Sequence, residues 1–113
     1  MPERKSTTEA VRRRGIGRDV ACVTVAGELD MVSVGVLEHA VADALADPAD
    51  TAVELDLAGV SFMDSTGLRA LLSARRRADA AGRRLRVVGA GPAVRRVLHL
   101  TRTAPLFELE PSD

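Results

Sequence analysis

The feature that most constrains this chain is a strand pattern that runs directly into a helix pattern. Val53, Leu55 and Leu57 alternate with polar residues, as in a β-strand with one buried face. The polar segment Asp64-Ser65-Thr66-Gly67 follows a few residues later. After it, leucines recur on one face of a helical pattern, at positions 68, 71 and 72. The sequence therefore predicts a strand-to-helix turn with Ser65 at the helix N-terminus.

The rest of the chain alternates between the same two kinds of pattern. Short alternating or apolar runs predict strands at 9–13, 20–26, 85–88 and 106–109, the first two forming a hairpin around Gly15-Ile16-Gly17-Arg18-Asp19. Further helices are predicted from Ser33, as the capping residue, to Asp47-Pro48, and from Pro92 onward. Their apolar faces are Leu37, Val41, Ala44 and Leu45, and Val94, Val97 and Leu98. Gly82 is suited to the left-handed end of the helix that begins at Ser65.

This alternation predicts a single α/β domain, a mixed β-sheet of four to five strands with α-helices packed against it. The 113 residues fit one domain, and a hydrophobic fraction of 46% is enough to build its core. Residues 1–8 are polar and without periodicity, so we expect a flexible tail there and the domain over 9–113.

Charge and composition exclude several functional classes. The 16 basic and 16 acidic side chains cancel, which argues against direct nucleic-acid binding. No apolar run approaches the roughly 18 residues of a membrane span, and the N-terminus lacks the apolar core of a secretory signal, so we expect a cytoplasmic protein without membrane contact. The lone Cys22 lies in an apolar run and is expected to be buried.

Ser65 has a simpler interpretation as a helix N-cap, a role worth about 1 kcal/mol. A catalytic nucleophile fits less well, because the Gly-x-Ser-x-Gly elbow would need glycine where Met63 stands and no His-Asp partner is identifiable. An aspartic protease would need two paired carboxylates, and Thr66 between Ser65 and Gly67 weakens that match further.

Two other site types are weighed and set aside. Asp30, Asp56 and Asp64 could converge at the strand ends and hold a divalent cation, but a turn role for Asp30, a solvent-exposed Asp56 and a capping Asp64 explain them better. Basic runs at 75–77, 83–84 and 95–96 suggest RNA binding, but the chain has only two aromatic residues with which to stack bases. We therefore expect neither a metal site nor a cofactor, and His39 and His99 are expected to be ordinary surface histidines.

Two segments in order carry a family resemblance. Gly27-Glu28-Leu29-Asp30, followed by 56–68 (DLAGVSFMDSTGL), resembles the STAS domain of bacterial anti-sigma-factor antagonists. Matches at Gly82, 85–89 and 94–101 extend the resemblance over roughly residues 9 to 109. The resemblance departs after Thr101, where the family commonly has a glycine and this chain has Arg102, and the family commonly adds a C-terminal helix.

The resemblance implies a non-enzymatic phosphorylation switch in transcription regulation under stress. The unphosphorylated form would bind an anti-sigma serine/threonine kinase and so release a sigma factor. Phosphorylation of Ser65 would end binding, and a phosphatase would reverse it. The partner-binding residues that the resemblance implies are Glu28, Asp30, Asp64, Ser65, Thr66 and Gly67. The alternative is a phospho-independent STAS scaffold or ligand-sensing module in a signalling or transporter-associated complex.

Overall fold

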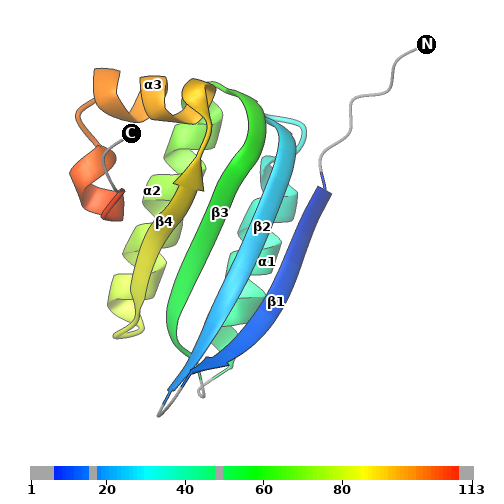
Figure 1. Ribbon diagram of the computed structural model, residues 1–113, viewed down its shortest axis with the longest axis vertical. Coiled ribbons are helices and arrows are strands. Elements are labelled where there is room, and N and C mark those ends of the chain that lie inside the picture. The colour runs from blue at the N-terminus through cyan, green and yellow to red at the C-terminus, as the bar shows by residue number, and fades with distance from the viewer. Residues whose placement is uncertain (1–6, 16–17, 48–49, 110–113) are drawn as a thin grey trace.

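A four-stranded mixed sheet organises the molecule, as the sequence predicts (Figure 1). The computed structural model describes residues 7–15, 18–47 and 50–109. The strands are β1 (Thr7–Gly15), β2 (Arg18–Leu29), β3 (Asp50–Met63) and β4 (Arg84–Ala90), in the spatial order β1-β2-β3-β4. β1 and β2 pair antiparallel, whereas β2 with β3 and β3 with β4 pair parallel.

Two long helices cover one face of this sheet. α1 (Val34–Ala46) follows β2 and α2 (Ser65–Ala80) follows β3, and Figure 1 shows both behind the sheet. α3 (Pro92–Leu100) follows β4 and lies across the end of the sheet. The short 3₁₀ helix η1 (Ala104–Phe107) then turns back beside β4. The predicted helix starts and the left-handed Gly82, with φ 71°, are confirmed.

Alternation along the strands separates a core face from a polar face. Val23, Leu55 and Val87 are in register on neighbouring strands and are all buried. One residue earlier on each strand, Cys22, Glu54 and Arg86 form the next register row, and all are only half-buried. Because successive side chains point to opposite faces, this second row lies on the face away from α1 and α2.

The prediction that Cys22 is buried is therefore wrong. The run from Val20 to Val25 is apolar at nearly every position, so composition alone does not reveal which alternate set faces the helices. Register with β3 decides it: Cys22 lies opposite Glu54, and Val23 lies opposite Leu55.

The N-terminal hairpin is confirmed, and it is longer than predicted. β1 begins at Thr7 and pairs with β2 up to Gly15 opposite Arg18. Thr7 and Thr8, assigned to the tail by the sequence analysis, belong to this strand. The rest of the predicted tail, residues 1–6, and the turn residues Ile16 and Gly17 lie outside the described residues.

The predicted strand at residues 106–109 is wrong, because the segment begins as the 3₁₀ helix η1. Ala104 and Phe107 are both buried, and their spacing of three residues is that of a 3₁₀ turn rather than of a strand. Pro105 favours this turn because it fixes φ and has no N–H for a strand ladder. Glu108 then takes a left-handed conformation, with φ 53°, which ends the helix.

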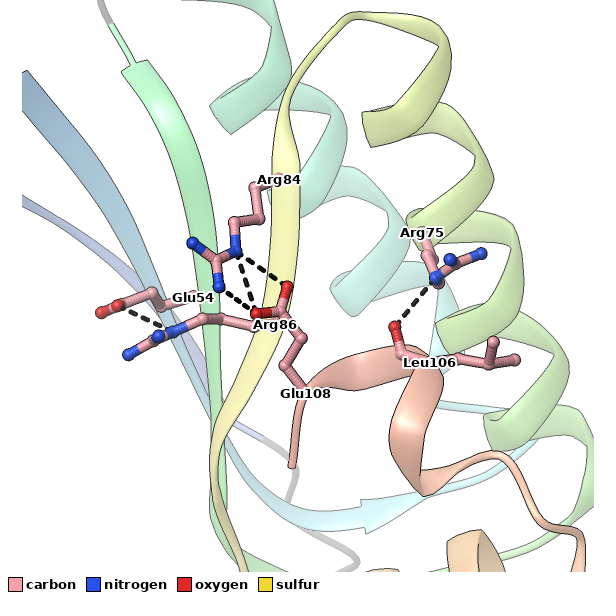
Figure 2. Close-up of polar contacts among 6 residues, drawn as sticks. All are labelled: Glu54, Arg75, Arg84, Arg86, Leu106 and Glu108. Atoms are coloured by element: carbon pink, nitrogen blue, oxygen red, sulfur yellow. Dashed lines mark hydrogen bonds and ion pairs between the residues drawn. The ribbon is translucent and has the colours of Figure 1, made fainter. Parts of the chain in front are cut away.

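A set of polar contacts holds this C-terminal segment against the rest of the fold (Figure 2). The Arg84 guanidinium binds both carboxylate oxygens of Glu108, and Arg75 Nε donates to the backbone carbonyl of Leu106 at 2.8 Å. We call residues 106–108 with Arg75 and Arg84 the C-terminal clasp. Through the clasp, the segment after α3 is attached to both α2 and β4.

Arg102 stands where the family commonly has a glycine. It follows α3 with φ 60°, in the left-handed region where a Cβ is unfavourable and glycine is preferred. The N–H of Arg102 donates to the carbonyl of His99 at 3.1 Å, and that of Thr103 to Leu98 at 2.9 Å. This chain therefore makes the turn after α3 with arginine, in the conformation that a glycine adopts more easily.

Candidate functional site: the β3–α2 junction

Asp64 caps the N-terminus of α2. Its Oδ1 accepts hydrogen bonds from the backbone N–H groups of Thr66, at 2.9 Å, and Gly67, at 3.1 Å. These are two of the N–H groups that a helix start leaves without intrahelical partners. The interpretation of Ser65 as the capping residue is therefore wrong, since Asp64 performs that role.

Ser65 is the first residue of α2, and its side chain is exposed. Within the described part of the chain, its hydroxyl has no hydrogen-bond partner. The hydroxyl is thus accessible from solvent and has no role in holding the helix start. The amide dipoles of α2 also favour negative charge at this end of the helix.

The loop after β2 is braced by its own side chains. The buried carboxylate of Asp30 accepts from the N–H groups of Val32, at 3.0 Å, and Ser33, at 3.2 Å. The Ser33 hydroxyl donates to the backbone carbonyl of Glu28 and accepts from the N–H of Asp30 at 3.1 Å. Ser33 stands at the predicted N-cap of α1 but makes no capping bond, because its hydroxyl is used in this loop.

Gly67 brings the two motif segments together. A Cβ on Gly67 would lie 2.7 Å from the Leu29 carbonyl oxygen and 2.6 Å from Met63 Cγ. Both distances are too short for real atoms, so only glycine lets α2 approach the end of β2 this closely. The segment 28–30 therefore lies beside the segment 64–66.

The structure thus places the six predicted partner-binding residues at one end of the sheet, with different exposure. Ser65 is exposed, Glu28, Asp64 and Thr66 are half-buried, and Asp30 and Gly67 are buried. Asp30 and Gly67 support the site through the loop hydrogen bonds and the close approach of α2 described above. The partner-binding role of all six residues stays a prediction.

A group of exposed apolar side chains, which was not predicted from the sequence, lies at the same end. Met31 and Val32, in the loop after Asp30, are 77% and 74% exposed, and Val36 and Phe62 are about half exposed. Phe62 is in register with Glu28 on the neighbouring strand. We call Met31, Val32, Val36 and Phe62 the apolar rim. Large exposed apolar side chains grouped in this way are typical of protein-binding surfaces. The signal available in the sequence was the apolar pair Met31-Val32 inside a turn.

The three aspartates considered as a metal site do not converge on one centre. Asp30 and Asp64 bind the local backbone groups described above, and Asp56 Oδ1 accepts from the N–H of Ala58 at 3.0 Å. Among the described residues, no group of three histidine, cysteine or acidic side chains is placed to hold a metal ion. Each aspartate instead satisfies its own turn or helix start.

Most residues in the basic runs support the fold. Arg83 donates to the carbonyls of Leu45 and Asp47, at 3.3 and 3.1 Å, and Arg95 Nε donates to Ala90 at 3.0 Å. Arg75 and Arg84 belong to the clasp. These arginines lie on different elements and hold carbonyls and carboxylates, so they do not form a single phosphate-binding track. Among the described residues, no helix is long and apolar enough to cross a membrane.

The fold is that of a known family. The STAS domain family model matches residues 8–112, and the chain belongs to this family. It is 33% identical over 90 residues to the anti-sigma-F factor antagonist RsfB of Mycobacterium tuberculosis, an alignment that covers 80% of this chain and 72% of RsfB.

Solved structures agree with this assignment. A crystal structure of an anti-sigma factor antagonist from Mycobacterium paratuberculosis matches with a TM-score of 0.75 and 34% identity, covering 94% of this chain and 87% of that one. The unphosphorylated form of the anti-sigma factor antagonist SpoIIAA matches with a TM-score of 0.70 at 23% identity, over 93% of this chain and 89% of that one. At that identity, the second match speaks for the fold alone.

Proposed function

We propose that this protein is an anti-sigma-factor antagonist controlled by phosphorylation of Ser65. In the cytoplasm, its unphosphorylated form binds an anti-sigma serine/threonine kinase and thereby frees a sigma factor. The observation that carries the proposal is the exposed Ser65 hydroxyl, which has no structural task because Asp64 already caps α2. The names of the relatives, anti-sigma factor antagonists, agree with it.

The apolar rim supplies the binding surface that the proposal needs. Met31, Val32 and Phe62 are exposed at the end of the sheet where Ser65 lies. A kinase that covers these side chains would bury apolar area while bringing its active site to Ser65. Glu28, Asp64 and Thr66 are half-buried beside the rim and would contribute polar contacts.

The modification itself is a phosphoryl transfer in which this protein is the substrate. The Ser65 oxygen forms a bond to the γ-phosphorus of ATP as the bond to the β,γ-bridging oxygen breaks, and ADP leaves with that electron pair. The hydroxyl proton passes to a base on the kinase. A phosphatase hydrolyses the serine phosphate and restores the binding form.

The added charge is large enough to end binding. A dianionic phosphate about 6 Å from one partner carboxylate is opposed by roughly 5 kcal/mol at an effective dielectric near 20, before salt screening. Since about 1.4 kcal/mol is a tenfold change in affinity, half of that repulsion would dissociate the complex.

The modification is tested by incubating the protein with its kinase and ATP and measuring intact mass. We expect one phosphoryl group, mapped to Ser65 by peptide analysis. Ser65→Ala should remain unmodified. Ser61→Ala changes a different exposed serine, which lies on β3, and this variant should be phosphorylated to the same extent as wild type. Stoichiometric modification of Ser65→Ala at Thr66 would show that the site is wrong.

The switch is tested by calorimetry with the purified anti-sigma kinase. We expect Ser65→Ala to bind as wild type does, because a small polar group is lost, and Ser65→Asp to bind more weakly, because a charge must be desolvated at the interface. The phosphorylated protein should bind most weakly of all. Equal affinities for all four forms would instead support a phospho-independent STAS scaffold.

A further inference from the structure

A groove lies between α1 and α2 and begins beside the proposed phosphorylation site. The groove is open to solvent and has a volume of about 390 Å³. Its polar lining comes from Thr66, Arg69, Ser73 and Arg76 on α2 and from Glu38 on α1, and its apolar lining includes Val34 and Leu72. Thr66 is the neighbour of Ser65 in the first turn of α2, so the groove opens at the turn that carries Ser65.

The groove is basic, and its arginines are available. Its lining includes two arginines, Arg69 and Arg76, and one acidic residue, Glu38. Both arginines are exposed, and within the described part of the chain neither makes an ion pair or a side-chain hydrogen bond. They differ in this from Arg75 and Arg84, which are held in the clasp. An anion that reaches the groove therefore meets cations that no described carboxylate neutralises.

Arg69 is placed to reach a phosphate on Ser65. The two residues are four apart on α2, which makes them neighbours on the helix surface. Long helical side chains tend to lean toward the helix N-terminus, the direction in which Ser65 lies from Arg69, and Arg69 and Thr66 line the same groove. Arg76 is eleven residues from Ser65, about 16 Å along the helix axis, which is beyond the reach of a serine phosphate.

We propose that this groove seats the phosphoryl group of phosphorylated Ser65, with Arg69 as its pairing residue. The proposal rests on phosphorylation at Ser65, as proposed above, and adds what the phosphate does next. A guanidinium can bind two phosphate oxygens at once, in addition to the helix N-terminus that already favours an anion there. Phosphorylation then changes the charge of the partner-facing surface in two ways. It adds a dianion, and it pairs the Arg69 guanidinium, which is no longer available to a partner.

The test measures the second pKa of the phosphate by ³¹P NMR. Phosphoserine is installed at position 65 during translation, so no kinase is needed and the outcome does not depend on whether a native kinase modifies the protein. An adjacent cation favours the dianion and lowers this pKa. We expect Arg69→Gln to raise the pKa of the phosphate by about 0.3 pH unit relative to the unsubstituted phosphoprotein, the effect of one exposed i,i+4 pair. Arg69→Lys should restore most of the lowering.

Arg76→Gln is the matched control, since it removes the other exposed arginine of the same groove. We expect it to leave the pKa of the phosphate within about 0.1 pH unit of the unsubstituted value, because screening at 0.15 M salt acts over about 8 Å. Equal phosphate pKa values in the Arg69→Gln, Arg69→Lys and unsubstituted phosphoproteins would overturn the pairing. So would an equal rise in Arg69→Gln and Arg76→Gln. Circular dichroism of each variant confirms that α2 is intact.

Discussion

At the scale of single residues, the members of the segment Asp64-Ser65-Thr66-Gly67 have different structural roles. Asp64 satisfies the first amides of α2, which leaves the Ser65 hydroxyl exposed and without that task. Gly67 has no side chain, and this lets α2 lie against Leu29. The serine proposed as the phosphorylation site is therefore not one of the residues that hold its helix in place.

Replacing Gly67 by alanine should destabilise the fold. The new Cβ would lie 2.7 Å from the Leu29 carbonyl oxygen, a backbone atom that moves only if the end of β2 moves. Overpacking of this kind costs about 1 to 3 kcal/mol, and we expect Gly67→Ala to lower the free energy of unfolding by about 2 kcal/mol. Urea denaturation measures the loss.

Gly35→Ala provides the control for that experiment. Gly35 lies in the first turn of α1, and a Cβ there would have no neighbour within 4 Å. Alanine is favoured over glycine in helices by about 0.5 to 1 kcal/mol, so this variant should be as stable as wild type or slightly more stable. Equal stability of Gly67→Ala and wild type would show that the two segments are not in close contact.

At the scale of elements, the C-terminal clasp replaces a fifth strand. The segment after α3 attaches to the fold through the buried side chain of Phe107, the bond from Arg75 to Leu106 and the ion pair of Arg84 with Glu108. The side-chain hydrogen bond from Arg84 lowers the pKa of Glu108 below its ordinary value. Residues 106–109 have a strand-like composition, but they form a turn held by the C-terminal clasp rather than an edge strand.

The lowered pKa of Glu108 gives the clasp a defined pH dependence. A carboxyl group with a depressed folded-state pKa stabilises the fold above its unfolded pKa of about 4.3, and the contribution is lost as pH falls through the folded pKa. We expect Glu108→Gln to be slightly less stable than wild type at pH 7 and equally stable at low pH. Denaturation at several pH values measures the difference.

Glu38→Gln is the reference variant for the clasp. Glu38 is an exposed carboxylate with no ion pair among the described residues. Its replacement removes the same carboxylate charge as Glu108→Gln without removing an ion pair among the described residues. A Glu108→Gln profile parallel to that of Glu38→Gln would argue against the ion pair as a stabilising contact.

At the scale of the whole molecule, the sheet topology gathers the ends of β2 and β3 at one edge. Parallel pairing aligns Leu29 with Met63, so the loop after β2 and the start of α2 emerge side by side. The apolar rim and Ser65 therefore lie at the same end of the domain, although Met31 and Phe62 are far apart in the sequence. The proposed kinase surface is a product of this topology.

The double variant Met31→Ser, Phe62→Ser tests that surface. Exposed apolar anchors dominate binding energies at interfaces, so we expect at least a tenfold loss of affinity for the anti-sigma kinase, about 1.4 kcal/mol or more. The melting temperature should change little, because neither side chain belongs to the core. Calorimetry and thermal denaturation measure the two effects.

Leu100→Ser is the matched control for exposure. Leu100 ends α3 and is 74% exposed, close to the 77% of Met31, but it lies outside the rim. We expect wild-type affinity for the kinase from this variant. Comparable weakening by Leu100→Ser and by the rim variant would show that general surface hydrophobicity, rather than the rim, governs binding.

The features that could be predicted from the sequence are those that depend on neighbouring residues. Alternation at Val53, Leu55 and Leu57 marked β3, helical spacing marked α2, and the polar segment between them marked the junction. These follow from neighbouring residues alone, because side-chain direction repeats with a fixed period in each element. The family motifs, which are also local strings, correctly identified the STAS family.

Only the tertiary structure decided which of several locally equivalent choices was taken. Pairing with β3 turned Cys22 toward the polar face, packing of Phe107 bent residues 104–107 into a 3₁₀ turn, and the approach of Leu29 made Gly67 a contact point. The apolar rim combines side chains from the loop after β2, from α1 and from β3, and the groove beside Arg69 combines side chains from α1 and α2. A single chain segment carries no record of such neighbours, because its own periodicity is satisfied whichever partner packs against it.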